Sequence, residues 1–234
     1  MDAQKILQEF FCSPENKSNT YFGHCVRVSN YVAAAYNELL NIPELRDKFV
    51  KYTQDTVVLA GLLHDIGKIE VPISVLLKPG SLSASEWTAM RKHTLASAEI
   101  LSNAVVRETI LRLWPKAQIG EIIEVALSHH ERPDGGGYPF GISKPITPLT
   151  RLCSICDTFD SITSDRPYRK AATAAQALEV IENSVGSQFN EKTAKALLEN
   201  TDWTHPAGVA EIYVVKGEID LGRCYQKAAV LGKS

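Results

Sequence analysis

The chain reads TVVLAGLLHDIGK over residues 56–68. An apolar run with the spacing of a helix leads directly into His64-Asp65, and Gly67 follows two residues later. Glycine commonly marks the end of a helix, so the pattern predicts an apolar helix over residues 56–63 that stops near Gly67. This helix delivers an imidazole and a carboxylate side by side at its C-terminal end.

Helical periodicity continues on both sides of this segment. Apolar residues recur at three- and four-residue steps over residues 21–40. Ser83 with Glu86 three residues later forms a capping-box pattern, which predicts a helix from Ser83 to about Leu101. Pro148 suits the first position of another helix. Further helices are expected over residues 119–130, 148–163, 172–183 and 190–199. The predicted fold class is all-α, a single helical bundle.

The length of 234 residues, 44% of them apolar, allows one sizeable domain with small additions. We expect an N-terminal helix or lead-in over residues 1–19, the helical domain over residues 20–202 and a small extension over residues 203–234. Residues 211–215 are strong β-formers, so the extension is expected to hold a short β element.

Charge and cysteine usage exclude several classes of protein. A net charge of −2 gives no basic field for duplex nucleic acid or an acidic membrane. The sequence contains no apolar run of the roughly 18 to 20 residues that span a bilayer, and residues 1–11 do not resemble a signal peptide. Five scattered cysteines argue against a disulfide framework and for a reducing cytoplasm. The expected protein is cytoplasmic, with neither a membrane nor a duplex nucleic acid as partner.

The histidines carry the chemical signal. A lone histidine on an apolar face is usually a core or surface residue, but several here adjoin acids at helix ends. Asp157 and Asp160 also lie three residues apart, on one face of a predicted helix. Burying these groups together is costly unless a cation neutralises them. A nitrogen and oxygen ligand set suits Fe, Mn, Zn or Ni better than Ca or Mg. The histidines concerned are His24, His64, His93, His129 and His130.

Several motifs occur in a fixed order along the chain. They are HDIGK at 64–68, LLKPG at 76–80, KH at 92–93, HHERPDGGGYP at 129–139 and DTFDSITSDRPYR at 157–169. Together they resemble the HD-GYP family, bacterial signalling phosphodiesterases of cyclic di-GMP within the HD superfamily of metal-dependent phosphohydrolases. The resemblance extends over residues 24–198.

The resemblance implies a cofactor and a ligand set. The cofactor is a pair of divalent transition metals, with Fe or Mn favoured and Ni or Zn as alternatives. Asp65 is expected to bridge both metals, which lower the pKa of a bridging water to give hydroxide. The implied ligands are His24, His64, Asp65, His93, His129, His130 and Asp157.

Further roles follow from the same resemblance. Lys68 is expected to contact the scissile phosphate and to help protonate the leaving oxygen. The other implied substrate contacts are Tyr138, Arg166 and Arg169. Asp160 is expected to orient a ligand or an arginine. Arg132 and Asp134 are expected to hold the glycine-rich loop in place.

The sequence departs from the family pattern in three places. Thr20 stands where some members have a glutamate for a third metal, so we expect a dinuclear centre. Residues 107–119 look like an insert. Cys153 and Cys156 have CxxC spacing, but on a helix this spacing indicates core packing rather than a redox or zinc pair.

The lead interpretation is hydrolysis of cyclic di-GMP to linear pGpG and on to GMP. Three alternatives stay open. The substrate could be cyclic GMP-AMP or a linear dinucleotide. The protein could be a sensor that binds a cyclic dinucleotide with little turnover. It could hydrolyse mononucleotides, although the Gly137-Tyr138-Pro139 loop argues against this. The sequence also leaves a homodimer open.

Overall fold

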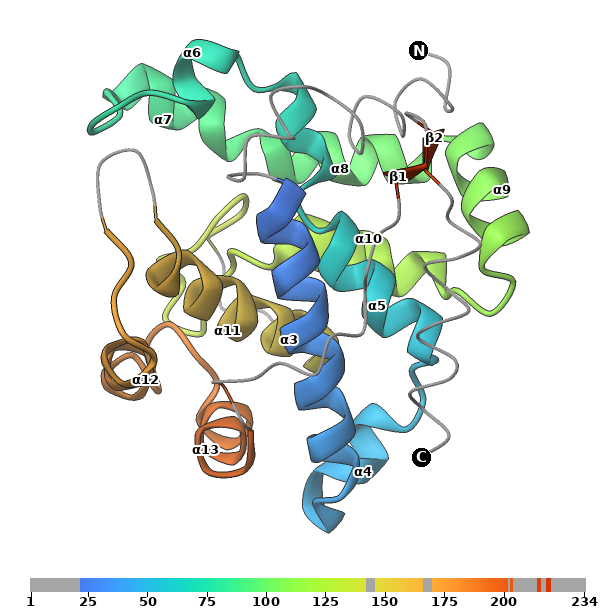
Figure 1. The fold of residues 1–234 in the computed structure, drawn as a ribbon, viewed down its shortest axis with the longest axis vertical. Coiled ribbons are helices and arrows are strands. Elements are labelled where there is room, and N and C mark those ends of the chain that lie inside the picture. The colour runs from blue at the N-terminus through green and yellow to red at the C-terminus, as the bar shows by residue number, and fades with distance from the viewer. Residues whose placement is uncertain are drawn as a thin grey trace.

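In the computed structural model, the described residues are 22–141, 146–165, 170–201, 203, 214–215 and 218–219. Almost all secondary structure in these residues is helical, which confirms the predicted all-α class. Figure 1 shows the helices gathered around α3 (Phe22–Leu40), with α5 (Gln54–Leu63) and α11 (Pro148–Thr163) beside it. None of the described helices has both the length and the hydropathy needed to cross a bilayer.

The remaining elements surround these three helices. Helices α12 and α13 pack beside α11, while α8 packs against η1 and α10 on the other side of the bundle. The bounds are α4 Pro43–Phe49, η1 Ile66–Glu70, α6 Ile73–Leu76, α7 Ala84–Arg91, α8 His93–Ser102, α9 Ala104–Leu113, α10 Ile119–Ser128, α12 Ala174–Asn183 and α13 Glu191–Asn200. A two-residue antiparallel ladder joins β1 (Val214–Val215) to β2 (Glu218–Ile219), so a short β element is present in the C-terminal segment.

Helix α5 belongs to two hydrophobic cores. Val57 and Ala60 face the larger core, which α3, α4 and α11–α13 complete. Leu59 and Leu63 face the smaller core, which η1 and α8–α10 complete. A helix that is buried on all sides needs no polar face, and this explains the unbroken apolar run over residues 56–63. The run fixes α5 between the cores and so fixes the position of the residues that follow it.

The sequence predicted several helices closely and one wrongly. Helix α11 begins and ends at the predicted residues, and Ser83 caps α7 through the predicted capping box. The continuous helix expected from Ser83 to Leu101 is wrong, because the chain turns at Lys92 and begins α8 at His93. At this break the carbonyl oxygen of Met90 accepts a hydrogen bond from Nδ1 of the His93 side chain at 2.7 Å. Helix α9 occupies much of the expected insert over residues 107–119.

Trp203 shows that the bundle core includes the first residue of the expected extension. Its ring is 4% exposed and packs against Tyr31 and Phe159, and its Nε1 donates to the carbonyl of Leu197 at 3.2 Å. The domain boundaries themselves stay a prediction. The expected lead-in over residues 1–19, together with Thr20, lies outside the described residues.

Gly67 allows η1 to approach α8 closely. A Cβ atom on Gly67 would lie 2.2 Å from the carbonyl oxygen of His93 and 2.4 Å from the amide nitrogen of Ser97. Both are backbone atoms, so the strain could be relieved only by moving η1 away from α8. We expect Gly67→Ala to lower the free energy of unfolding by about 1–3 kcal/mol, the usual cost of overpacking, as measured by urea denaturation.

Gly120 provides the matched control for this prediction. It lies in α10, and an added Cβ would meet open space. Gly120→Ala should leave the stability unchanged or raise it by up to about 1 kcal/mol, because alanine loses less backbone entropy in a helix. Equal effects of the two substitutions would contradict the close approach at Gly67.

Candidate metal centre

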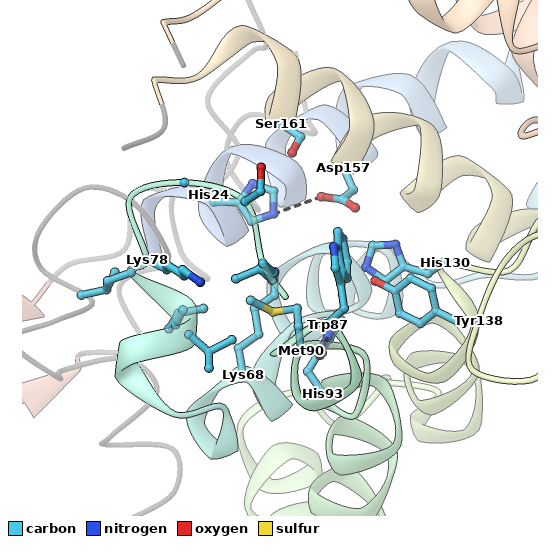
Figure 2. A pocket seen from close by; sticks show the side chains of 16 residues that line it. His24, Lys68, Lys78, Trp87, Met90, His93, His130, Tyr138, Asp157 and Ser161 are labelled. Carbon is cyan, nitrogen blue, oxygen red and sulfur yellow. Dashed lines mark hydrogen bonds and ion pairs between the residues drawn. The ribbon is translucent and has the colours of Figure 1, made fainter. Parts of the chain in front are cut away.

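Imidazoles and carboxylates from five helices meet at one end of the bundle. His24 lies in the first turn of α3, His64 and Asp65 directly follow α5, and His93 begins α8. His129 and His130 follow α10, and Asp157 projects from the middle of α11. Figure 2 shows His24, His93, His130 and Asp157 around a common space. The structure therefore brings together all seven residues that the sequence singled out as metal ligands.

The Asp65 carboxylate lies at the centre of this cluster and is 1% exposed. Its Oδ1 is 3.1 Å from Nε2 of His93 and 3.7 Å from Nε2 of His129. Its Oδ2 is 3.2 Å from Nε2 of His64 and 3.7 Å from Nε2 of His24. Each oxygen of one carboxylate thus faces a different pair of imidazoles.

The donor atoms fall into two groups that could each hold a metal ion. Within each group the ligand atoms lie within 4.8 Å of one another. One group is Asp65, His93, His129 and His130, and the other is His24, His64 and Asp157. Asp157 joins the second group through its Oδ1, which is 3.1 Å from Nε2 of His24. Two adjacent His/Asp clusters suggest a dinuclear metal site.

Backbone carbonyls fix how three of the imidazoles present their nitrogens. Nδ1 of His64 lies 2.8 Å from the carbonyl oxygen of Gly61, and Nδ1 of His129 lies 3.1 Å from the carbonyl oxygens of Val125 and Ala126. His93 makes the equivalent contact with Met90. A carbonyl oxygen only accepts hydrogen bonds, so each Nδ1 carries a proton and donates it. In the neutral ring this leaves the lone pair on Nε2, which points into the cluster.

The hydrogen bonding of these Nε2 atoms indicates whether a metal ion fits the cluster. Within the part of the chain that the structure describes, the buried Nε2 atoms of four histidines have no hydrogen-bond partner. Lone pairs that face carboxylate oxygens repel them unless a cation lies between. Metal–ligand bonds of ~2.1 Å place two ligands of one ion roughly 3–3.5 Å apart, close to the nitrogen–oxygen spacings seen around Asp65. The four histidines are His24, His64, His93 and His129.

The pKa values of Asp65, His129 and His130 favour metal binding at neutral pH, whereas that of His64 is shifted the other way. Burial alone would raise the pKa of Asp65, but Lys68 and His64 hold it well below its usual range. Burial lowers the pKa of His129 well below its ordinary value and that of His130 to about 3. An ionised carboxylate and neutral imidazoles are the forms that coordinate metals. For His64, burial lowers the pKa, but the Asp65 carboxylate more than offsets this and raises it.

Asp160 supports the cluster from behind His24. Its Oδ2 accepts from Nδ1 of His24 at 2.7 Å, and its two oxygens accept from Nε and Nη2 of Arg27 at 2.5 and 3.0 Å. The sequence predicted that Asp160 orients a ligand or an arginine, and the carboxylate contacts one of each. Arg27 was missed, although its spacing of three residues from His24 matches that between Asp157 and Asp160.

The glycine-rich loop over residues 131–140 closes one side of the site. Arg132 pairs with Asp134 through Nε–Oδ1 at 3.0 Å and Nη2–Oδ2 at 2.5 Å. The Asp134 Oδ1 also accepts from the amide of Gly136 at 2.8 Å. Gly137 is required for the fit, since a Cβ there would lie 2.4 Å from the carbonyl oxygen of His130. These contacts are those expected of residues that hold the loop in place.

Glu131 closes this loop on itself, and Tyr138 connects it to the cluster. Glu131, which the sequence did not identify, is 2% exposed and accepts from the amide of Phe140 at 2.7 Å. The Tyr138 ring stacks on His130 with centroids 4.5 Å apart and planes at 28°. Burial raises the pKa of Tyr138, so its hydroxyl stays protonated. The loop thereby places an aromatic ring against a metal-ligand candidate.

A cavity of about 600 Å³ opens onto the cluster. Lys68 lines it and forms an ion pair with Oδ2 of Asp65, and Tyr138 lines it from the loop. Lys78, held by Glu86 at 2.6 Å, adds a second ammonium group. Figure 2 shows both lysines on the side of the cavity away from Tyr138. Arg166 and Arg169, the other predicted substrate contacts, lie outside the described residues.

Comparisons with known proteins agree with this geometry. A family model described as the HD domain matches residues 23–193. A probable cyclic di-GMP phosphodiesterase of Vibrio cholerae is 38% identical over 125 residues, which cover 51% of this chain and 26% of that protein. The 3'3'-cGAMP-specific phosphodiesterase 2 of the same organism is 42% identical over 85 residues, which cover 36% of this chain and 14% of that protein.

One solved structure shares the fold. It is that of Bd1817, an HDG"Y"P protein from Bdellovibrio bacteriovorus, with a TM-score of 0.55 at 21% identity over 79% of this chain and 53% of that chain. The chain spans about a quarter or less of the length of the two curated relatives.

Metal analysis tests the centre directly. We expect the protein loaded with Mn²⁺ and then desalted to retain two ions per chain, and Asp65→Ala to retain few or none, because Asp65 faces both groups. Asp134→Ala, which removes an exposed carboxylate of the neighbouring loop, should retain both ions. Elemental analysis gives the stoichiometry, and two ions on Asp65→Ala would contradict the proposed bridge.

A stability measurement provides a second readout. Ligands that bind only the folded state stabilise it by roughly 2.7 kcal/mol at a hundredfold excess over Kd. Mn²⁺ should therefore raise the unfolding temperature of the wild type and of Asp134→Ala but not that of Asp65→Ala.

Proposed function

Because this chain belongs to the HD-domain family, we propose that it is a metal-dependent phosphodiesterase that hydrolyses cyclic di-GMP to linear pGpG. The observation that carries the proposal is the position of the buried Asp65 carboxylate, whose two oxygens face two groups of imidazoles beside a cavity. The cavity falls within the range of about 300–1,000 Å³ typical of small-molecule sites.

Bound divalent ions would supply Lewis-acid stabilisation of phosphate oxygens and would acidify water. The N/O ligand set favours Fe or Mn, with Ni or Zn as alternatives. The seven residues that would hold them are His24, His64, Asp65, His93, His129, His130 and Asp157. Asp160 keeps His24 in one tautomer and orientation, since it accepts the Nδ1 proton.

The other residues bind substrate and move a proton. Lys68 and Lys78 place positive charge along the cavity and attract the phosphates of the dinucleotide. Lys68 adjoins Asp65, so its ammonium group is positioned to donate a proton to the oxygen that leaves phosphorus. Tyr138 projects from the loop, stacks on His130 and lines the cavity, where it would contact the nucleotide. Arg166 and Arg169 are proposed as additional contacts to the substrate on the basis of the sequence motif.

Cyclic GMP-AMP is the second candidate substrate, because relatives named for either substrate are similar to this chain. The metal cluster cannot distinguish them, since both substrates have the same phosphodiester linkage. A linear dinucleotide, and further hydrolysis of pGpG to GMP, use the same chemistry. A sensor that binds without turnover is distinguished by the fate of the bound nucleotide.

Turnover of cyclic dinucleotides tests the proposal. The protein is purified without oxygen, loaded with Mn²⁺ or Fe²⁺ and given cyclic di-GMP or cyclic GMP-AMP, and the products are separated by chromatography. We expect cyclic di-GMP to be lost faster, with pGpG as the first product. His64→Ala and Asp65→Ala should abolish activity. Faster loss of cyclic GMP-AMP would transfer the assignment to that substrate, and tight binding with no product would identify a sensor.

Substitution of Lys68 separates proton donation from metal binding. Lys68→Gln keeps a polar side chain but removes the ammonium group, so we expect kcat to fall about 100-fold, in the range typical of lost general acid catalysis. The metal content should be unchanged. Lys195→Gln, which alters an exposed pair with Glu191, is the control and should keep full activity. An unchanged kcat for Lys68→Gln would remove Lys68 from the reaction.

A further inference from the structure

Trp87 is an exposed aromatic residue that lines the cavity beside the metal cluster and has no role in the function proposed above. Its side chain projects from α7 and lines the same cavity as His130 and Asp157, yet the residue is 46% exposed. The chain has three tryptophans. The other two, Trp114 and Trp203, are 8% and 4% exposed and belong to the two cores. A half-exposed indole that lines a cavity presents a large, flat apolar surface to whatever occupies that cavity.

Several apolar residues line the cavity together with Trp87. Met90 lies one turn further along α7, and Leu77 and Leu82 belong to the segment that leads into this helix. We call Trp87, Met90, Leu77 and Leu82 the apolar wall. Figure 2 shows Lys78 on the side of the cavity away from Trp87, whereas Asp157 and His130 are drawn close to the indole. One cavity thus combines a charged part suited to phosphate with an apolar part suited to a flat, weakly polar group.

Arg91 restrains this indole and connects it with the loop. Its guanidinium carbon lies 5.7 Å from the centroid of the Trp87 ring and 5.6 Å from that of Tyr138. Both distances are within the range of cation–π attraction. Within the described ranges, no carboxylate forms an ion pair with Arg91. Tyr138 in turn stacks on His130, so ring contacts run from the metal cluster to Trp87.

We propose that Trp87 is the base-stacking residue of this site, and that the apolar wall binds one purine of the dinucleotide while its phosphodiester lies at the metal cluster. The inference rests on the proposed function and adds a residue that contacts a base of the substrate, which the sequence motifs did not identify. A purine has the flat apolar faces that an indole stacks on, and its ribose-phosphate leads toward the charged part of the cavity. Stacking of a base on an aromatic side chain is a sequence-tolerant mode of nucleotide recognition.

Steady-state kinetics with cyclic di-GMP and Mn²⁺-loaded protein test this role. Trp87→Ala should raise KM about 5- to 100-fold, the loss expected for one base stack, and change kcat less than about threefold. Trp87→Phe keeps an aromatic ring and should recover most of this loss. Ile73→Ala is the matched control, because Ile73 is 51% exposed on the neighbouring α6 but does not line the cavity. A KM for Trp87→Ala within twofold of the wild type, or a loss confined to kcat, would overturn the proposal.

Nucleotide binding measured by tryptophan fluorescence separates this inference from the proposed function. GMP should quench the exposed indole in the wild type at concentrations at least about fivefold lower than CMP, because a purine stacks over a larger area. The quenching should be absent in Trp87→Phe, in which only the two buried tryptophans remain. If no cyclic dinucleotide is hydrolysed, the proposed function fails, but quenching by GMP that depends on Trp87 would still support the stacking site. Equal quenching in Trp87→Phe would overturn it.

Discussion

The Asp65 carboxylate is buried among imidazoles, and this burial constrains how the surrounding helices begin and end. A buried charge is costly unless it is paired and hydrogen-bonded, and several kcal/mol per ion is the usual scale. Lys68 neutralises part of this charge through Oδ2, while four Nε2 lone pairs converge from the surrounding helices. An imidazole lone pair and a carboxylate repel each other, so cations held between them would stabilise the arrangement. The chemistry proposed for the site is thus a consequence of how the cluster is neutralised.

The fold meets this constraint by ending and starting helices at one place. Helix α5 is held between two cores, and this packing fixes the positions of His64 and Asp65, which directly follow the helix. The turn at Lys92 begins α8 at His93, and Gly67 lets that helix approach the segment after Asp65. Backbone carbonyls of the last helical turns then orient the rings of His64 and His129. Helix ends thus supply most of the ligand candidates and also the carbonyl acceptors that orient His64 and His129.

Local sequence patterns predicted the parts of this arrangement that depend on local chemistry. The start of α11 followed from Pro148, and the seven ligand candidates followed from the family resemblance that the ordered motifs carry. The break between α7 and α8 was missed because both segments are helical and no proline or glycine separates them. Arg27 and Glu131 were missed because their roles depend on contacts with Asp160 and Phe140, which are distant in sequence or on a loop. Trp87 has no motif signal, and only the cavity reveals it.

Two different demands meet in this cavity, and the structure separates them. The metal-ligand candidates, most of them buried, lie in or directly after helices that pack in the cores. A base must enter and leave, and the apolar wall lies on the short α6–α7 segment, where side chains are half-exposed. The rings of His130 and Tyr138 and the guanidinium of Arg91 join the two regions through direct contacts. If a base binds at Trp87 as proposed, a shift of the loop over residues 131–140 would change its alignment with the phosphate, because Tyr138 of this loop contacts both Arg91 and His130.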